Sequence, residues 1–277
     1  MSGHAKQYSI DGLVLRESAY GENDCMFSLL TAERGRITVL AKGARSMKSR
    51  VRGGIQPYTY GNYEISEKSG PGWIRSVSVT ESFFGLRAGL LPLMLAAYLS
   101  DIACELSGEG VPADELLQLT LNTFFLLSSR VSPDDEEEIL RIKAAYELRA
   151  MAISGYAPEL SSCSKCGKDA PKDDRWYLDV MNGSLTCGTC IRKAADARVP
   201  LPDPYETGSA TILLPLSPSA VSAMQYVTEA PPKRVFSFGI SDTEGRETFS
   251  KAAEAYLEHH LERTFESLKF FHTVRKG

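Results

Sequence analysis

Apolar and polar residues alternate in five short stretches near the start of the chain, as they do in strands that bury one face. Polar turns separate the first three stretches, and a longer polar segment follows the third. The expected strands are residues 8–17, 25–31, 37–41, 55–66 and 73–80. Short strands in this number are typical of a small closed barrel, and an OB-fold over residues 1–82 fits best. A five-stranded SH3-like barrel has the same periodicity and stays open as an alternative.

After residue 82, apolar residues recur at intervals of three and four, which is the spacing of helices that bury one side. The third helix is expected to begin with Ser132 as its N-cap and Pro133 as its first residue. A serine oxygen accepts a backbone N–H at the cap, and proline needs no N–H partner at the next position. The expected helices are residues 86–106, 112–127, 133–155, 217–228 and 243–273.

The proline-rich segment 199–218 interrupts the helical pattern and is predicted to be an irregular connector. Together the patterns predict a multidomain α+β chain in which a helical domain follows the barrel. This helical domain comes in two parts, residues 83–160 and 199–277. The segment between them, residues 161–198, holds four of the six cysteines.

Those four cysteines form two CxxC pairs, Cys163 with Cys166 and Cys187 with Cys190, separated by twenty residues. A hairpin over residues 176–183 would bring the pairs together as a zinc ribbon. Four thiolates fill a tetrahedral site and leave no position for water, so we expect one structural Zn²⁺. Redox-active CxxC pairs are the competing interpretation.

The other two cysteines, Cys25 and Cys104, lie in apolar patterns and are expected in the core. His259 and His260 are expected at the surface and at the edge of the core rather than on a metal. Cations near the CxxC pairs can offset the negative charge of a Zn–S₄ centre. They are Lys165, Lys168, Arg192 and Lys193.

The chain has 277 residues, of which 43% are hydrophobic, and this is enough for two or three domains with a proper core. Its beginning lacks the apolar segment of a secretory signal, and its longest apolar run, residues 90–99, is far short of the ~20 residues that span a bilayer. We expect a soluble, cytoplasmic protein without membrane contact. No hydrolase motif such as G-x-S-x-G or H-E-x-x-H occurs, so no enzymatic activity is expected.

Charge is divided unevenly, with a net +4 on residues 1–80 and a net −8 on residues 81–277, within a total of −4. The positive charge is concentrated in residues 42–54, KGARSMKSRVRGG, which we call the basic segment and which hold five cations and no carboxylate. Unpaired cations are costly to bury, so this segment must lie in solvent or against a polyanion. A solvated surface loop is the plain interpretation, and binding to nucleic acid is the one we favour.

The predicted nucleic-acid-binding residues are the cations in and just before the basic segment, together with neighbouring tyrosines on which bases could stack. They are Arg34, Arg36, Lys42, Arg45, Lys48, Arg50, Arg52, Tyr58 and Tyr60. Tyr63 is a further candidate, although alternation along the strand buries at least one of the three tyrosines.

Three parts of the chain resemble the bacterial recombination mediator family RecO: residues 41–65, residues 140–163 and the second CxxC pair, CGTC. The resemblance spans nearly the whole chain. It implies an N-terminal OB-fold, a helical domain and a zinc-binding module. It also implies a non-enzymatic DNA repair protein that binds single- and double-stranded DNA and anneals complementary strands, without a need for ATP.

The resemblance further implies three protein partners: RecR, the C-terminal tail of the single-stranded-DNA-binding protein (SSB), and the recombinase RecA, which the family helps to load in the RecF pathway. It places the protein at the nucleoid in the cytoplasm. Three other functions stay open on the residues alone. They are a protein adaptor whose basic segment only steers encounter, a zinc-dependent nucleic-acid hydrolase, and an RNA-directed barrel.

Overall fold

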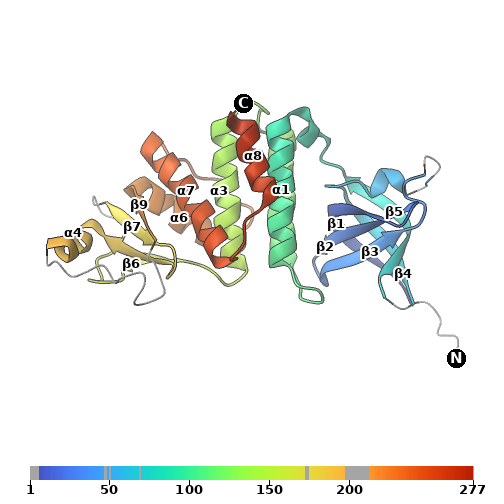
Figure 1. The fold of residues 1–277 in the computed structure, drawn as a ribbon, viewed down its shortest axis with the longest axis horizontal. Helices are drawn as coiled ribbons and strands as arrows, with labels where there is room; N and C mark the ends of the chain where they lie inside the picture. Colours follow the sequence, from blue (N-terminus) through green and yellow to red (C-terminus); the bar gives the residue numbers. More distant parts are fainter. Residues whose placement is uncertain are drawn as a thin grey trace. The chain divides into compact units, whose positions relative to one another are not determined.

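The computed structural model describes residues 6–46, 49, 51–68, 70–171, 175–196 and 212–276. The chain forms two compact units, one made of Met1–Ile139 with Phe265–Gly277 and the other of Leu140–Thr264. The first unit contains a β-barrel and the helices packed with it, and the second contains a small sheet and further helices (Figure 1). The division into four segments that the sequence suggests, at residues 1–82, 83–160, 161–198 and 199–277, stays a prediction.

The barrel of the first unit is built from strands that alternate between its interior and its surface. In the second strand, for example, Cys25, Phe27 and Leu29 are buried and the residues between them are not. The strands are β1 (Lys6–Tyr20), β2 (Asp24–Thr31), β3 (Gly35–Ala41), β4 (Tyr60–Glu67) and β5 (Gly72–Glu81).

The strand order is β1-β2-β3-β5-β4, and pairing of β1 with β4 closes the barrel. The β3–β5 pair is parallel, whereas its other pairs are antiparallel. Strand β1 serves two neighbours, because residues 6–13 pair with β4 and residues 13–20 pair with β2, with a bulge between Val14 and Arg16 that bends the strand. This is an OB-fold barrel, as predicted.

The fourth strand is shorter than the sequence indicated. It begins at Tyr60 rather than at Ile55, because Tyr58 has a φ of 68°, a left-handed conformation that a strand does not contain. The backbone around Tyr58 crosses the bulge of β1 instead. There the Tyr58 N–H donates to the Val14 carbonyl at 2.8 Å, and the Val14 N–H donates to the Thr59 carbonyl at 3.0 Å.

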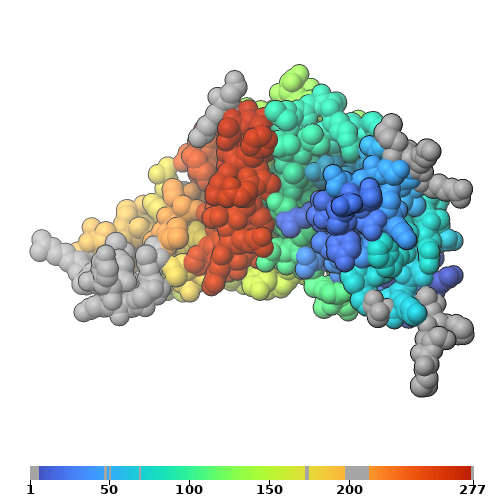
Figure 2. Space-filling model, turned by 45° about the vertical axis from the view of Figure 1, so that its right-hand side comes forward, coloured from blue at the N-terminus to red at the C-terminus, as the bar shows by residue number. Residues whose placement is uncertain are grey.

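Helices pack beside the barrel in the same unit: η2 (Phe84–Ala88), α1 (Leu90–Leu106), α2 (Asp114–Ser129) and α8 (Glu266–Lys276). Helix α8 lies along α1 (Figures 1 and 2). The Phe265 ring meets the Tyr98 ring edge-on at 5.6 Å, and the Ser267 hydroxyl donates to the Asp101 carboxylate at 2.6 Å. The C-terminal segment therefore belongs to the same unit as the barrel, although the two are far apart in the sequence.

Backbone hydrogen bonds also join the turn between α1 and α2 to the turn between β2 and β3. The Arg36 N–H donates to the Gly108 carbonyl at 3.3 Å, and the Gly110 N–H donates to the Arg34 carbonyl at 2.9 Å. Such paired bonds extend the barrel's hydrogen bonding onto the helical part. The barrel and these helices are thus tied together at one end of β3.

Helix α3 (Glu136–Ile153) begins three residues later than predicted. Asp135, not Ser132, caps it, since Asp135 Oδ1 accepts the backbone N–H of Glu138 at 3.1 Å. An aspartate at this position satisfies an N–H that has no partner inside the helix and also favours the positive end of the helix dipole. The acidic run at the start of α3 is explained by these helix-end effects.

The predicted single helix over residues 243–273 is wrong. Helix α7 (Thr243–His260) ends first, and α8 begins only at Glu266. Glu262 has a φ of 48°, and a left-handed residue terminates a right-handed helix. The break also coincides with the border between the two compact units, which lies between Thr264 and Phe265.

The sheet of the second unit has four strands in the order β6-β8-β7-β9. They are β6 (Glu159–Cys163), β7 (Trp176–Asp179), β8 (Ser184–Cys187) and β9 (Leu213–Leu216). The predicted hairpin is formed by β7 and β8, but part of the predicted irregular connector is the strand β9. Strand β9 pairs with β7, with Leu216 opposite Trp176 and Leu213 opposite Asp179. The sequence did not predict this strand because Pro215 lies within it. An edge strand tolerates a proline.

Two helices, α6 (Pro218–Glu229) and α7, pack against this sheet in the same unit. A third, α4 (Gly188–Asp196), directly follows strand β8. Ser217 caps α6 by accepting the N–H of Ala220 at 3.2 Å, and α6 matches the helix predicted there. Within the described part of the chain, no helix combines the length and apolar character that crossing a membrane would require.

Candidate nucleic-acid interface and metal centre

The basic segment begins where β3 ends, and the turn between β1 and β2 holds its start in place. The backbone N–H of Gly43 donates to Asp24 Oδ1 at 2.7 Å, and the Arg45 guanidinium donates to the carbonyl of Glu22 at 3.1 Å. Both Lys42 and Arg45 are exposed. This end of the barrel therefore presents cations on a turn that is fixed by hydrogen bonds.

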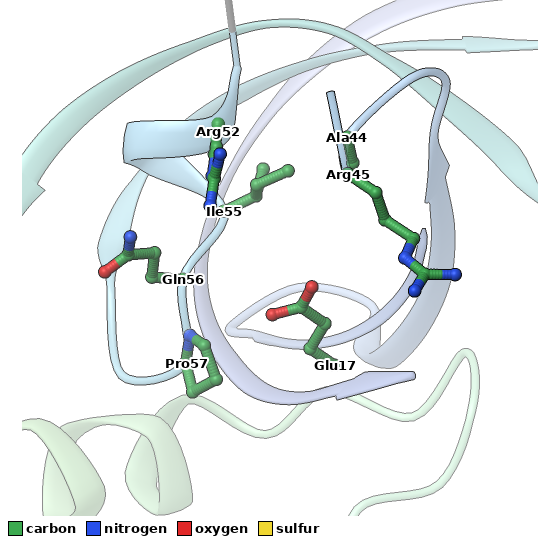
Figure 3. A pocket seen from close by; sticks show the side chains of 7 residues that line it. All are labelled: Glu17, Ala44, Arg45, Arg52, Ile55, Gln56 and Pro57. Atoms are coloured by element: carbon green, nitrogen blue, oxygen red, sulfur yellow. The ribbon is translucent and has the colours of Figure 1, made fainter. Parts of the chain in front are cut away.

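An open pocket of about 340 Å³ lies beside this turn (Figure 3). Arg45 and Arg52 lie on opposite sides of it, and the Glu17 carboxylate points into it from β1. Two guanidinium groups against one carboxylate give the lining a net positive charge, which suits an anionic group such as a phosphate. The lining residues are Glu17, Ala44, Arg45, Arg52, Ile55, Gln56 and Pro57.

Two of the three tyrosines considered for base stacking are structural. Tyr63 is fully buried, and its hydroxyl donates to the carbonyls of Gly54 at 3.0 Å and Thr59 at 3.3 Å, which positions the end of the basic segment. Tyr58 is only 8% exposed, its ring packs edge-on against Phe124 at 5.4 Å, and burial raises its pKa to about 12. The expectation that Tyr58 stacks on bases is corrected, because its ring is enclosed by protein.

Arg34 and Arg36 lie at the other end of β3 from the basic segment. Seven residues of strand separate the two ends by roughly 20 Å. The Arg34 guanidinium lies over the Tyr8 ring, 4.7 Å from its centroid, and 3.9 Å from the Glu67 carboxylate. The structure therefore does not bring these two cations together with the basic segment, although they are its near neighbours in sequence.

The remaining predicted residues are Lys48, Arg50, Arg52 and Tyr60. Lys48 and Arg50 lie outside the described residues. Arg52 is exposed at the start of the short helix η1 (Arg52–Gly54), and Tyr60 is half-buried at the start of β4. Contact of these side chains with nucleic acid, like that of Lys42 and Arg45, remains a prediction.

Sequence reasoning missed several residues that shape the site. Glu17, Gln56 and Pro57 line the pocket, and Asp24 accepts the hydrogen bond that holds the start of the basic segment. Asp24 follows a Gly-Glu-Asn turn, and such a position is a usual place for a side chain that binds backbone. Nothing in the local sequence marks Glu17, since it reaches the pocket only because β1 passes beneath it.

The four predicted metal ligands form one cluster, with all their sulfur atoms within 4.8 Å of one another. Cys163 ends β6, Cys187 ends β8, and Cys190 lies in the first turn of α4. The Sγ atoms of Cys166 and Cys187 are 3.8 Å apart. A tetrahedral site with Zn–S bonds of about 2.3 Å requires sulfur separations of about 3.8 Å, so the cluster fits one such ion.

The electrostatics of the cluster also fit a cation. Burial opposes ionisation of Cys163, but backbone N–H groups, first that of Cys187, donate to its sulfur and lower the pKa of its thiol to about 6. Burial and the neighbouring sulfur atoms raise the pKa of Cys190 to about 12. Thiols that compete in this way for one negative charge are those that a dication would allow to ionise together. Because the 3.8 Å contact joins one cysteine from each pair, the geometry favours one shared ion over two redox pairs.

No second group of this kind is found among the residues that the structure describes. Cys25 and Cys104 are buried, as predicted. His260 lies at the edge of the core, also as expected, with Nε2 3.0 Å from the carbonyl oxygen of Val180. The candidate sites are thus the basic end of the barrel in the first unit and the cysteine cluster in the second.

Comparison with known proteins identifies relatives over nearly the whole chain. The family described as Recombination protein O N terminal matches residues 1–83, and the family described as Recombination protein O C terminal matches residues 88–204. The chain is 30% identical to the DNA repair protein RecO of Acetivibrio thermocellus over 263 residues, 95% of each chain. It is 32% identical to that of Anaeromyxobacter sp. (strain K) over 267 residues, 96% of each chain. The DNA repair protein RecO of Syntrophus aciditrophicus is 26% identical over 271 residues, 97% of this chain and 96% of that one.

Proposed function

This chain belongs to the RecO family of DNA repair proteins, and on that premise we propose that it binds single- and double-stranded DNA and anneals complementary strands without ATP. The observation that carries this proposal is the placement of Arg45 and Arg52 on either side of an open pocket at the end of an OB-fold barrel. OB-folds bind single strands with a positively charged surface. The same surface is the most basic part of an otherwise acidic chain.

The proposed mechanism is charge neutralisation. Lys42, Arg45 and Arg52, together with Lys48 and Arg50, contact phosphates and release counterions, and each contact adds about 0.7 to the logarithmic salt slope on single strands. Two strands whose backbones are neutralised on one protein repel each other less. Base pairing then drives annealing, and no catalytic residue is needed.

Family membership also supports the proposed partners. We assign to this chain contact with RecR and with the C-terminal tail of SSB, and through them a role in loading RecA on SSB-coated single strands. These interactions place it on DNA in the cytoplasm. The cysteine cluster holds one structural Zn²⁺, because its four thiols leave no position for a reacting water. The protein is therefore proposed to be a mediator and not an enzyme.

A salt-titrated annealing assay without nucleotide tests the proposal. Labelled complementary oligonucleotides, bare and then coated with SSB, are mixed with the wild-type chain and with the double variant Lys42→Gln/Arg45→Gln. We expect the wild type to accelerate pairing, and the variant to lower the salt slope of single-strand binding by up to about 1.4, which is 0.7 for each cation removed.

The matched control is Lys251→Gln/Lys269→Gln, which removes the same charge from exposed positions on α7 and α8. It should leave the slope and the annealing rate unchanged. If the control and the loop variant weaken binding equally, net charge and not the basic segment determines affinity. Binding of DNA without faster pairing would favour the adaptor, and metal-dependent strand cleavage would favour the hydrolase.

A further inference from the structure

A strained turn after β5 presents an aromatic side chain to solvent. Phe83 has φ 44° and ψ 47°, a left-handed conformation that is costly for a residue with a side chain. The Glu81 carboxylate stabilises the turn by accepting the N–H groups of Ser82 at 2.8 Å and Phe83 at 3.0 Å. As a result, Phe83 is buried against Phe124, whereas the next residue, Phe84, is 71% exposed.

Close packing of η2 on α2 keeps Phe84 in this place. A Cβ atom on Gly85 would lie 1.8 Å from the carbonyl oxygen of Ser128, so η2 approaches α2 more closely than any larger residue allows. Leu86, also in η2, is fully buried and anchors this short helix in the core. Phe125 lies on α2 one turn before Ser128 and is 46% exposed. Two exposed rings are therefore presented by two elements that are packed together.

Each exposed ring has an arginine beside it. The Arg87 guanidinium lies 5.5 Å from the centroid of Phe84, and the Arg130 guanidinium lies 5.7 Å from the centroid of Phe125. Large apolar side chains at the surface of a protein mark binding sites when they gather in a patch. A patch of aromatic rings with adjacent cations suits a partner that combines flat rings with negative charge.

Arg87 links Phe84 to the basic end of the barrel. Arg87 Nη2 donates to the carbonyl of Pro57 at 3.2 Å, and Pro57 lines the same pocket as Arg45 and Arg52. Beyond Arg130 the chain turns acidic at residues 134–138, where carboxylates repel phosphates and a nucleic-acid track would end.

We propose that Phe84 and Phe125 are base-stacking residues for single-stranded DNA that leaves the basic pocket, with Arg87 and Arg130 beside its phosphates. The inference rests on the proposed function and adds to it the stacking residues that Tyr58 and Tyr63 cannot supply, since both are buried. The contact of Arg87 with Pro57, which lines the basic pocket, favours nucleic acid over an acidic peptide as the ligand. Stacking on phenyl rings is tolerant of sequence, as a strand-annealing protein needs.

The test measures binding of a fluorescent single-stranded oligonucleotide to the full-length chain at several salt concentrations. Phe84→Ala should weaken binding roughly 5- to 150-fold, the effect of losing one base–aromatic stack, and should leave the salt slope unchanged because no charge is removed. Phe84→Trp should restore affinity, and the emission of the added indole should fall when a base stacks on it. Phe125→Ala should act in the same direction.

Phe270→Ala is the matched control, because Phe270 is 52% exposed on α8 in the same compact unit and lies outside the proposed track. The inference is wrong if Phe84→Ala binds the oligonucleotide as the control does while Lys42→Gln/Arg45→Gln binds it weakly, a result that would leave the proposed function intact. It is also wrong if Phe84→Ala loses only the binding of an acidic peptide with one aromatic residue. Absence of oligonucleotide binding by the wild type would overturn both proposals. Phe84→Leu, which keeps an apolar side chain without a π face, should bind as weakly as Phe84→Ala.

Discussion

Lys143 and Glu147 lie one turn apart on α3, with 2.7 Å between Nζ and Oε1, and both side chains are fully buried. Glu254 on α7 joins them, 2.6 Å from the same ammonium group. Burial alone would lower the pKa of Lys143, but these two carboxylates hold it above its ordinary value, so the lysine stays charged. This ion cluster connects α3 with α7 inside the second unit.

Removing one partner of this cluster should be strongly destabilising. Lys143→Met leaves a buried carboxylate without its cation and should lower the free energy of unfolding by about 3–5 kcal/mol. The double variant Lys143→Met/Glu147→Leu should be more stable than the single variant, since the two fully buried charges leave together and Glu254 is partly exposed. Urea unfolding of the second unit measures both. Lys251→Met, which breaks the exposed pair with Glu247, should change stability by less than about 1 kcal/mol.

Gly35 cannot accept a side chain. Its φ is +61°, and a Cβ atom would lie 2.2 Å from the carbonyl oxygen of Gly108 and 2.3 Å from that of Val111. Gly35→Ala should therefore separate the β2–β3 turn from the helices and lower the melting temperature of the first unit. Gly21→Ala is the control, with a φ of +63° and nothing within 4 Å of the added atom. It carries the cost of the left-handed conformation, about 1–2 kcal/mol, without the clash.

Equal destabilisation by Gly35→Ala and Gly21→Ala would show that the close approach at Gly35 contributes nothing. Thermal melting followed through the emission of Trp73, on β5 of the barrel, reports on the first unit in a chain that carries Trp176→Phe.

His260 should make the second unit sensitive to mild acid. Its ring packs against Tyr256 with 4.1 Å between centroids, and Nε2 contacts the Val180 carbonyl. Burial lowers the pKa of His260, the Val180 carbonyl partly opposes this, and the neighbouring His259 lowers it further. The unfolded chain therefore takes up a proton first as the pH falls. The contribution of His260 to stability is present above about pH 6.5 and is lost as the pH falls through the depressed pKa of the folded state.

The measurement is urea unfolding between pH 7.5 and pH 5 in a Trp73→Phe chain, where the buried Trp176 reports on the second unit. His260→Gln keeps a donor for the Val180 carbonyl and loses the titration. Its stability should fall less with acid than that of the parent chain. Parallel pH profiles of the two chains would remove His260 as the cause.

Loss of a metal ligand should affect the second unit and spare the proposed DNA-binding surface. Cys163→Ala should weaken binding of the one expected zinc ion, because the three remaining thiols leave one position of the tetrahedral site to water. The sheet keeps an apolar core that includes Trp176, Leu178 and Leu185, so we expect local loosening around α4 and a lower melting temperature rather than complete unfolding. Metal content by elemental analysis and Trp176 emission follow the two effects.

Cys25→Ala is the control for Cys163→Ala and should retain the metal. Single-strand affinity should be the same for all these chains, since the basic pocket belongs to the other compact unit. A loss of DNA affinity in Cys163→Ala that matched the loss of metal would instead assign a DNA contact to the zinc module.

Local sequence patterns were sufficient to predict those features that residues close together in the sequence determine. Alternation through Cys25, Phe27 and Leu29 predicted a half-buried strand, and the strand is there, because period-two alternation directly reports one buried face. The two CxxC pairs predicted one cluster, since the short spacing within each pair lets it reach one ion. Helix ends were less accurate, as the shift of the α3 cap from Ser132 to Asp135 illustrates.

The candidate nucleic-acid site depends on contacts that no local pattern contains. Arg34 and Arg45 are eleven residues apart in sequence, yet the direction of β3 places them at opposite ends of the barrel. Tyr58 has the sequence context of a strand residue, but its left-handed backbone turns the ring toward Phe124. Phe84 sits beside a buried phenylalanine and is nevertheless exposed.

The sequence by itself determined that this chain has a small five-stranded barrel, a largely helical remainder and a four-cysteine cluster, because periodicity and ligand spacing are properties of short segments. Only the tertiary structure decided which cations share a surface and which aromatic rings face solvent. Those outcomes depend on strand pairing and on close approaches between distant residues, such as Gly85 against Ser128, and they are decided only when the whole unit packs.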